Sequence, residues 1–281
     1  TGVVGNNLRM ALDWLPTAKK LITIKCDVEI NYSWSDFEKK DQDNKTLVNL
    51  YQKYNFSSWL RDMGAQIENS SQEITNELLI KPQADFVGTK DYQLINKKND
   101  LTLWINEIRE RKFFSIDTET NSLDTMKAEL VGISLCINPG RACYIPLSHK
   151  NSSEDQLSLT DVLDEFKPIL EDSSIKKLGQ NIKYDAHIFL NYGIKVNGIS
   201  DDTMLMSYVI ESNQNHGMDK LSSKYLGHTC KSYESLVGKG VNQITFDQVS
   251  IEDAVPYAAE DADVTLQLYL AMQETLNSNV S

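Results

Sequence analysis

Two acidic residues, Asp117 and Glu119, are separated by a single residue at the end of an apolar run, in the stretch FFSIDTETNSLD at 113–124. Side chains two positions apart on a strand leave the same face of the sheet, so both carboxylates are expected to point the same way. A solvated hairpin end explains such a pair without any function. A bound divalent cation also explains it, provided that further oxygen ligands converge on the same point.

Further acidic residues occur in two helices that are predicted much later in the chain. Asp185 lies in GQNIKYDAHIF, within a helix predicted over 181–192. Tyr257 and Asp261 are four residues apart in PYAAEDADVTLQLYL, so they share one face of a helix predicted over 251–276. An exposed helical aspartate and a tyrosine at the rim of a core are the ordinary explanations. Four such sites together favour a common function.

Four carboxylates from three separate elements can bind two divalent cations of the magnesium class, which prefer oxygen ligands. Such a site clamps the attacking and leaving oxygens of an in-line phosphoryl displacement and needs no catalytic histidine. The chain has only four histidines, all scattered, and no G-x-S-x-G, P-loop or G-x-G-x-x-G motif. Its four cysteines form no C-x-x-C pair, so neither a zinc site nor a disulfide framework is expected.

The elements that would position these residues predict an α/β fold with a mixed sheet. Alternating or continuous apolar runs predict strands at 92–95, 113–117, 129–137, 142–147, 176–179 and 195–199. Helical spacing and capping residues predict helices at 99–111, 159–171, 181–192, 202–211, 218–226 and 251–276. The strand that carries the first acidic pair should lie inside this sheet.

The chain is expected to have three parts. Residues 1–63 form a small, mostly helical segment, with helical spacing over 5–24 interrupted at Pro16, a short strand at 27–32 and helices within 44–63. Residues 64–88 are polar and predict a linker of moderate to high mobility, and residues 89–281 form the main domain. Of 28 basic and 40 acidic residues, 9 and 8 lie in the first 62, so the excess acid belongs to the remainder.

The motifs D-x-E (117, 119), N-x-x-x-D (181, 185) and Y-x-x-x-D (257, 261), in this order, resemble the three exonuclease motifs of the DEDD superfamily, tyrosine subtype. The longer strings LGQNIKYD, HGMDKLSSKYL and YAAEDADVTLQL resemble the 3'–5' proofreading domain of the bacterial DNA polymerase I family, over about 89–276. This resemblance implies a ribonuclease H-like mixed sheet flanked by helices. Residues 1–63 resemble the end of the 5'-nuclease domain of that family, which implies an internal fragment whose polymerase domain would follow in cis.

The resemblance also implies roles for the acidic residues. Asp117 would bridge two divalent ions, Glu119 and Asp261 would complete the first metal site, and Asp185 would support the second. Tyr257, helped by Glu119, would orient the attacking water. Mg²⁺ is the expected metal, with Mn²⁺ and Zn²⁺ as alternatives.

A substrate-binding set follows from the same resemblance: Thr118, Leu123, Gln180, Asn181, Lys183, Tyr184 and Tyr233. Leu123 would wedge near the terminal base, Asn181 would contact the terminal nucleotide, and Tyr233 would stack near the DNA end. Lys183 and Tyr184 would touch the backbone or shape the pocket. Familiar members carry a basic residue where this chain has Asn215, so a phosphate contact is expected to be lost.

These observations predict a metal-dependent 3'–5' exonuclease that releases 5'-dNMPs from single-stranded or frayed DNA 3' ends, within a polymerase of DNA replication and repair. The net charge of −12 argues against a broad basic groove, but bound cations reverse the local field. Two alternatives stay open: a ribonuclease D-like RNA exonuclease and a non-catalytic domain that positions DNA. A monomer in the bacterial cytosol, near the nucleoid and without a membrane partner, is expected.

Overall fold

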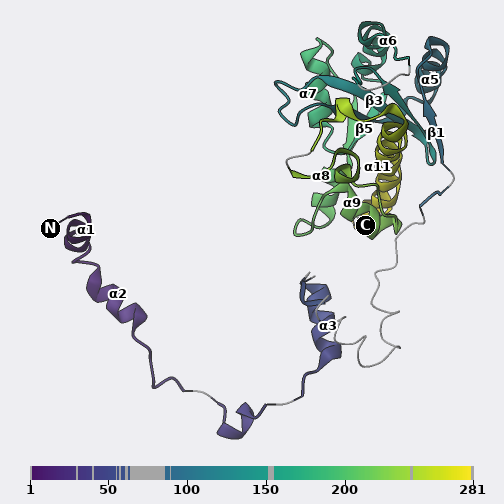
Figure 1. Ribbon diagram of the computed structural model, residues 1–281. Coiled ribbons are helices and arrows are strands. Elements are labelled where there is room, and N and C mark those ends of the chain that lie inside the picture. The colour runs from purple at the N-terminus through teal and green to yellow at the C-terminus, as the bar shows by residue number, and fades with distance from the viewer. Residues whose placement is uncertain are drawn as a thin grey trace. The chain divides into compact units, whose positions relative to one another are not determined.

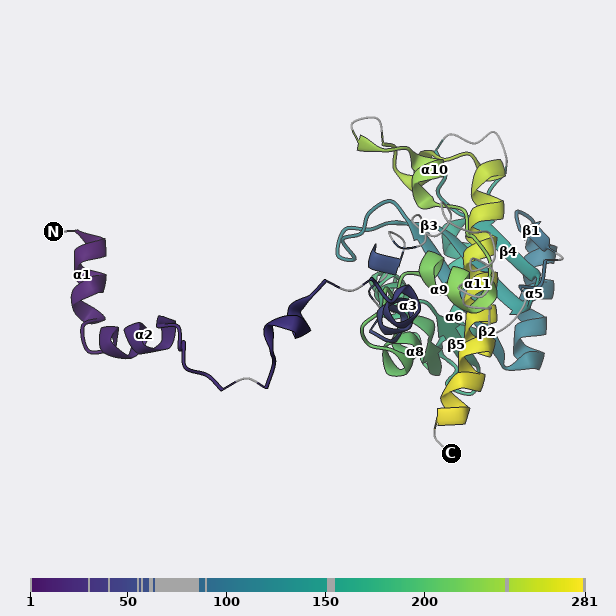
Figure 2. The same cartoon turned by 90° about the horizontal axis from the view of Figure 1, so that it is seen from below.

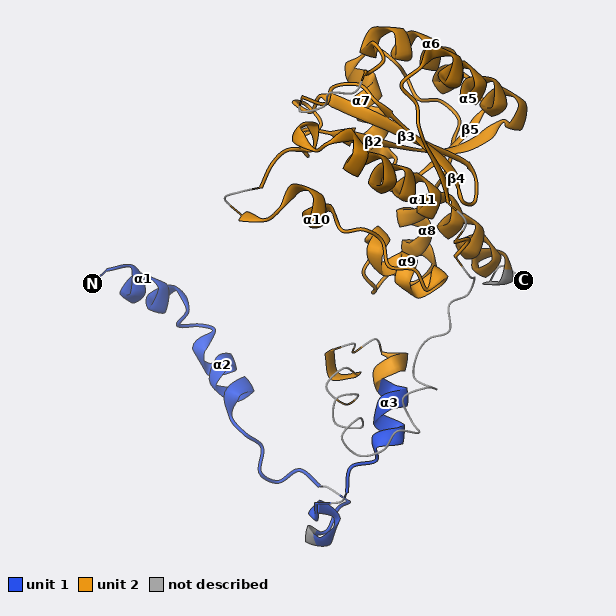
Figure 3. Ribbon diagram, turned by 45° about the vertical axis from the view of Figure 1, so that its right-hand side comes forward, with its two compact units in different colours: residues 1–50 blue, residues 51–281 orange. Residues whose placement is uncertain are grey.

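The computed structural model describes residues 2–29, 31–39, 41–54, 56, 58–60, 63, 86–88, 90–150, 155–240 and 243–279 (Figure 1). The chain divides into two compact units, residues 1–50 and 51–281 (Figure 3). Apart from 86–88, the predicted linker lies outside the described residues, so the domain boundaries at 63 and 88 stay predictions. Within the described residues, no helix has the length and apolar character needed to cross a membrane.

The first unit contains short helices, α1 (Val3–Met10), α2 (Leu15–Ile22) and the start of α3 (Asn44–Lys53), and a 3₁₀ turn η1 (Trp34–Phe37). The helical run predicted over 5–24 is interrupted near Pro16, because α1 ends at Met10 and α2 begins at Leu15. Pro16 lies in the first turn of α2, where its missing N–H has no intrahelical partner to lose. The described residues of 27–32, all but Ile30, form no strand, because a lone strand has no neighbour to pair its backbone.

The second unit is built on a mixed six-stranded sheet, which confirms the predicted fold class. Its strands are β1 (Asp91–Leu94), β2 (Phe113–Thr120), β3 (Leu130–Asn138), β4 (Arg141–Pro146), β5 (Lys176–Gly179) and β6 (Ile199–Asp202). Their order across the sheet is β1-β4-β3-β2-β5-β6. Strand β2 pairs antiparallel with β3 and parallel with β5, so it lies inside the sheet as the apolar run predicted.

Strand β6 begins where the predicted strand at 195–199 was expected to end. Gly198, just before it, has a φ of 71°, a left-handed conformation in which the chain turns rather than extends. A side chain there would lie 2.6 Å from the carbonyl oxygen of Ile175. The turn at this glycine therefore sets the beginning of the strand.

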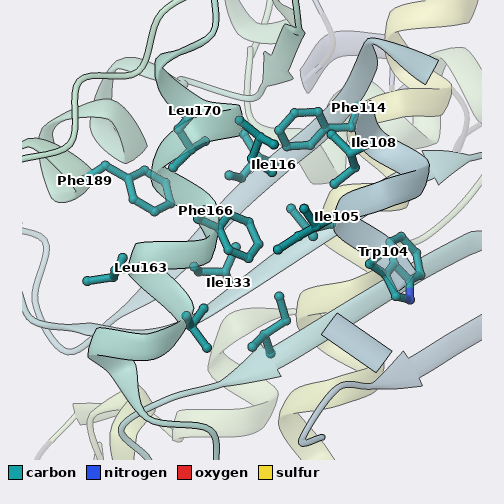
Figure 4. Packing of buried hydrophobic residues seen from close by; sticks show 14 of the residues in the cluster. Trp104, Ile105, Ile108, Phe114, Ile116, Ile133, Leu163, Phe166, Leu170 and Phe189 are labelled. Atoms are coloured by element: carbon teal, nitrogen blue, oxygen red, sulfur yellow. The ribbon is translucent and has the colours of Figure 1, made fainter. Parts of the chain in front are cut away.

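Helices cover both faces of the sheet. They are α5 (Lys98–Arg111), α6 (Leu159–Glu171), α7 (Lys183–Asn191), α8 (Thr203–Ile210), α9 (Met218–Leu226), α10 (Tyr233–Val237) and α11 (Ile251–Asn279), with a 3₁₀ turn η3 (Phe246–Gln248). Side chains of α5, α6 and α7 meet alternate residues of the central strands in one large core, where Phe166 packs near Ile105 and Ile133 (Figure 4). Helix α11 lies on the opposite face (Figure 2).

The alternation along β2 decides which of its residues face α11. Phe114 and Ile116 belong to the core under α5 and α6, whereas Phe113 packs toward α11. Ser115, on the same face as Phe113, donates a hydrogen bond of 2.7 Å to the carbonyl oxygen of Ala262 in α11. The next residues on that face are Asp117 and Glu119, so the sheet directs both carboxylates toward α11.

Candidate active site

Three carboxylates meet where β2 approaches α11. One oxygen from each of Asp117, Glu119 and Asp261 lies within 4.8 Å of the others. The bond from Ser115 to Ala262 joins the strand and the helix next to Asp261, which fixes the approach. Oxygen ligands from two rigid elements at this separation suit a hard divalent cation such as Mg²⁺ or Mn²⁺.

Burial and mutual repulsion make this cluster reluctant to ionise without a cation. Burial raises the pKa of Asp117 to about 7. Burial raises the pKa of Glu119 and of Asp261 well above the usual range, and the charge of Asp117 adds to both shifts. A cation between the carboxylates would reverse this balance, because it favours the charged form of every ligand.

Asp185 is held beside this cluster by Thr118. Its Oδ1 accepts hydrogen bonds from the backbone N–H of Thr118 at 2.9 Å and from the Thr118 hydroxyl at 2.5 Å. Burial, followed by the charge of Asp117, raises the pKa of Asp185. Asp185 therefore joins the acidic group electrostatically, with one oxygen already engaged by the strand that carries Asp117.

The helix that carries Asp185 begins at Lys183, two residues later than predicted. Asn181 has a φ of 59°, which ordinary residues adopt rarely, so it lies outside the helix. The carboxylate of Asp202 accepts hydrogen bonds from the backbone N–H groups of Asn181 and Ile182, each at 3.0 Å. Asp202 thereby stabilises the turn that brings Asp185 to the site.

A cleft of about 660 Å³ opens over the carboxylates. Of the twelve predicted site residues, eleven line it: Asp117, Thr118, Glu119, Leu123, Gln180, Asn181, Tyr184, Asp185, Tyr233, Tyr257 and Asp261. Leu123 is 94% exposed, so its side chain is free to contact a ligand. The structure therefore brings together residues that are up to 144 positions apart in the sequence.

Lys183 is the predicted site residue that lies elsewhere. It lines a second, smaller hollow together with His187 and Lys195. Two positions along a helix correspond to a rotation of about 200°, so Lys183 and Asp185 leave α7 on opposite sides. A direct contact of Lys183 with a ligand in the main cleft therefore has no support from its position.

Aromatic side chains form one wall of the cleft. Tyr257 is 9% exposed, and burial, followed by the charge of Asp261, raises the pKa of its hydroxyl. The rings of Tyr233 and Phe246 are nearly parallel, with centroids 6.3 Å apart, and Phe246 also contacts Tyr257. Tyr233 is 40% exposed and lines the cleft, which suits stacking against a flat ligand.

The opposite rim is fastened through Tyr184. Its hydroxyl donates a hydrogen bond of 2.6 Å to the carbonyl oxygen of Ser122 and lies 2.5 Å from the Thr120 hydroxyl. These bonds hold the loop that precedes Leu123. Thr120, Ser122 and the bond from Thr118 to Asp185 were not predicted from the sequence, because nothing in the local pattern links residues more than 60 positions apart.

If the chain is the metal-dependent exonuclease that its sequence predicts, Thr118→Val should lower its rate about tenfold, the lower end of the effect of residues that orient metal ligands. The substitution removes the hydroxyl donor to Asp185 but keeps the backbone donor. The Mg²⁺ concentration for half-maximal rate should rise, which a purely structural role would not cause. Thr102→Val, at an exposed helical threonine, is the matched control. An unchanged rate and metal dependence would remove Thr118 from the site.

Known relatives match most of the chain. Residues 92–277 match the family model described as 3'-5' exonuclease. DNA polymerase I of Pseudomonas aeruginosa is 37% identical over 263 residues, 92% of this chain and 28% of that protein. DNA polymerase I of Rhizobium leguminosarum is 43% identical over 204 residues, 66% of this chain and 20% of that protein. The chain thus spans less than a third of the length of these relatives.

Solved structures show the same fold at low sequence identity. Trypanosoma brucei RNase D is similar with a TM-score of 0.53 and 18% identity, covering 65% of each chain. The POL domain of Pol1 from M. smegmatis is similar with a TM-score of 0.51 and 17% identity, covering 66% of this chain and 28% of that one. The predicted ribonuclease H-like class is confirmed. The chain belongs to the 3'–5' exonuclease family, in the form found within DNA polymerase I.

Proposed function

We propose that this chain is a metal-dependent exonuclease that removes the terminal nucleotide, as a 5'-monophosphate, from a single-stranded or frayed DNA 3' end. The observation that carries the proposal is the group of three carboxylates within 4.8 Å at the floor of the cleft. An oxygen-only ligand set of this kind suits phosphodiester hydrolysis by two divalent cations. The match to the 3'–5' exonuclease family supports the direction of cleavage.

The walls of the cleft favour one strand over a duplex. Tyr233, Leu123 and Ile244 offer aromatic and apolar surface to bases, which is how single strands are bound without a sequence code. None of the described residues that line the cleft is basic. A phosphodiester would therefore be repelled by the acidic floor unless cations were bound, so the metal would serve both binding and chemistry.

The chain's own residues would divide the remaining work. Bound cations would supply an activated water and would stabilise the leaving 3' oxygen. Asp117, Glu119 and Asp261 would hold them, and Asp185, fixed by Thr118, would complete the second site. Tyr257, one helical turn before Asp261, would orient the attacking water. Leu123 would separate the terminal base from its neighbour.

We also propose that the exonuclease acts as the proofreading part of a monomeric DNA polymerase I in the bacterial cytosol, with the polymerase domain in cis. The two relatives described above are DNA polymerases I of bacteria, and the match to the Pseudomonas aeruginosa protein covers 92% of this chain. An unpaired 3' end is the substrate that a polymerase produces after misincorporation. This role would place the enzyme in DNA replication and repair.

Matched DNA and RNA oligonucleotides of one sequence, labelled at the 5' end, test the proposal. With Mg²⁺ or Mn²⁺, single-stranded DNA should shorten one nucleotide at a time, faster than a blunt duplex and faster than RNA. Chromatography should identify 5'-dNMPs as products. Faster cleavage of RNA would favour the ribonuclease D-like alternative. No cleavage of either strand, together with no metal binding in calorimetry, would favour a non-catalytic domain.

Tyr257→Phe is expected to lower the turnover rate by about 10²-fold, the lower range for groups that assist proton movement in catalysis. The ring stays packed against Phe246, while the hydroxyl near the charge of Asp261 is lost. Single-turnover measurements on labelled DNA separate this effect from weaker binding. Tyr32→Phe, at an exposed tyrosine of the first unit, is the control. A rate within twofold of the unmodified protein would contradict the role of Tyr257.

A further inference from the structure

A second group of side chains that could bind a metal includes Glu260, the neighbour of Asp261 on α11. One ligand atom from each of His228, Cys230 and Glu260 lies within 4.8 Å of the others. His228 and Cys230 belong to the segment after α9, and Glu260 belongs to α11. No zinc site was expected from the sequence, because the cysteine has no C-x-x-C partner and Glu260 is 30 residues further along.

We propose that His228, Cys230 and Glu260 bind a divalent cation of the zinc class, independently of the carboxylate cluster in the cleft. One imidazole, one thiolate and one carboxylate are the three ligand types that such borderline-soft ions accept, with a water in the fourth place. Nε2 of His228 is already 3.2 Å from Oε1 of Glu260. Two ligands of one tetrahedral zinc ion are about 3.4 Å apart at the usual bond lengths.

The surroundings hold two of the ligands before any ion arrives. The ring of Phe86 stacks on His228 at 3.9 Å with an angle of 10° between the planes. The backbone N–H of Lys231 donates to Oε2 of Glu260 at 2.8 Å, which leaves Oε1 turned toward His228. Such supporting contacts are typical of built metal sites, because they fix the direction of each ligand.

The local charge also favours a cation. Glu260 is 2% exposed and carries one strong ion pair, from Nζ of Lys90 to its Oε1 at 2.7 Å. Burial raises the pKa of the Cys230 thiol to about 12, and the charges of Asp261, Glu260 and Asp219 add to this shift, which a bound cation would reverse. Lys90 is 35% exposed, so its ammonium group can move into water when a doubly charged ion takes its place, while the thiol releases its proton to solvent.

Occupation of this site would connect two parts of the cleft wall. The ligands join the segment at 228–230, which leads into Tyr233, to the helix that carries Asp261. A bound ion would therefore tie the stacking tyrosine to the helix of the acidic floor. The site shares no ligand with the catalytic cluster, so the two can be tested separately.

Cadmium titration of the full 281-residue chain tests the proposal, because a cadmium–thiolate bond gives a charge-transfer band in the near ultraviolet. The titration uses an Asp117→Ala background, which removes a ligand of the other cluster. We expect a band that saturates at one equivalent and that Cys230→Ser abolishes. His228→Gln should weaken binding more than about tenfold. If Cys230→Ser does not fold, as judged by its circular dichroism spectrum, the cadmium affinity of His228→Gln provides the test, because His228 is partly exposed.

Two further variants sharpen the result. Lys90→Gln should tighten cadmium binding several-fold, because it removes the group that competes for Glu260. Cys26→Ser, at the exposed cysteine of the first unit, should leave the band unchanged. A missing band, a band that survives Cys230→Ser, or an affinity that ignores both His228→Gln and Lys90→Gln would overturn the proposal. None of these readouts depends on nuclease activity.

Discussion

Replacing Asp117 by alanine is expected to abolish metal-dependent release of 3'-terminal nucleotides, with a loss of at least about 10³-fold in rate. Asp117 shares the acidic cluster with Glu119, two residues along β2, and with Asp261 on α11. Its charge also contributes to the raised pKa of Glu119, Asp185 and Asp261, so it interacts electrostatically with each of the other three acids. Its loss should remove the ligand that any bound cation shares.

The same substitution should stabilise the metal-free protein at neutral and alkaline pH. Burial raises the pKa of Asp117 to about 7, so the folded protein holds this proton more tightly than the unfolded chain does. The stability that results is fully present below about pH 4 and is lost as the pH rises from about 4 through 7. A shift of about three units corresponds to at most about 4 kcal/mol. Asp117→Ala removes this loss, so its melting temperature in a chelator should exceed that of the unmodified protein above pH 7.

Asp164→Ala, on the exposed side of α6, is the matched control for charge and size. It should change neither the rate nor the pH dependence of melting. Activity measured on labelled DNA and melting followed by calorimetry, both with and without Mg²⁺, separate the two effects. Retained nuclease activity in Asp117→Ala would remove the acidic cluster from the mechanism, whereas a lower melting temperature in chelator would contradict the repulsion.

Gly132→Ala is expected to destabilise the second unit by about 3 kcal/mol or more, the upper range for overpacking in a closed core. A methyl group at this position would lie 2.1 Å from the hydroxyl oxygen of Tyr144 and 2.3 Å from its Cζ. Tyr144 is fully buried, and its hydroxyl is 2.8 Å from Nε2 of His149, so the ring has no free direction in which to move. Melting temperature should fall by about 6 to 12 °C.

This strain would also reach the site, because Gly132 is the cross-strand partner of Glu119. The nuclease rate at a temperature well below melting should therefore fall as well. Gly88→Ala, at a glycine with open space around it, is the control and should change neither quantity. Adding Tyr144→Leu should recover part of the lost stability, so that the double variant is less destabilised than the sum of its parts. A melting temperature unchanged by Gly132→Ala would contradict the prediction and would show that β3 and β4 can shift to accommodate the methyl group.

The acidic residues could be found from the sequence because their chemistry depends on spacing within single elements. The alternation along β2 fixes Asp117 and Glu119 on one face, and four positions along α11 place Tyr257 beside Asp261. The strands of the mixed sheet could be predicted because each is an apolar run that can be recognised without knowing its neighbours in the fold. These features need no knowledge of what lies across the fold.

The remaining features depend on contacts between distant segments. The late start of α7 depends on the carboxylate of Asp202, and the orientation of Asp185 depends on Thr118. The group at His228, Cys230 and Glu260 arises only because α11 lies against the segment after α9. The position of Lys183 could have been predicted, because two residues along a helix place Lys183 and Asp185 on opposite sides of α7. Lys183 was assigned to the site from the family resemblance alone.

The assembly of the cleft from both ends of the domain has a consequence for synthesis on the ribosome. Asp261 follows Asp117 by 144 residues, and at about 5 to 20 residues per second its translation comes roughly 7 to 30 s later. During that interval β2 carries the carboxylates of Asp117 and Glu119 without that of Asp261, and the face that will receive α11 is uncovered. We therefore expect the nascent chain to be inactive as a nuclease, with Phe113 and its neighbours uncovered until the final helix has been made.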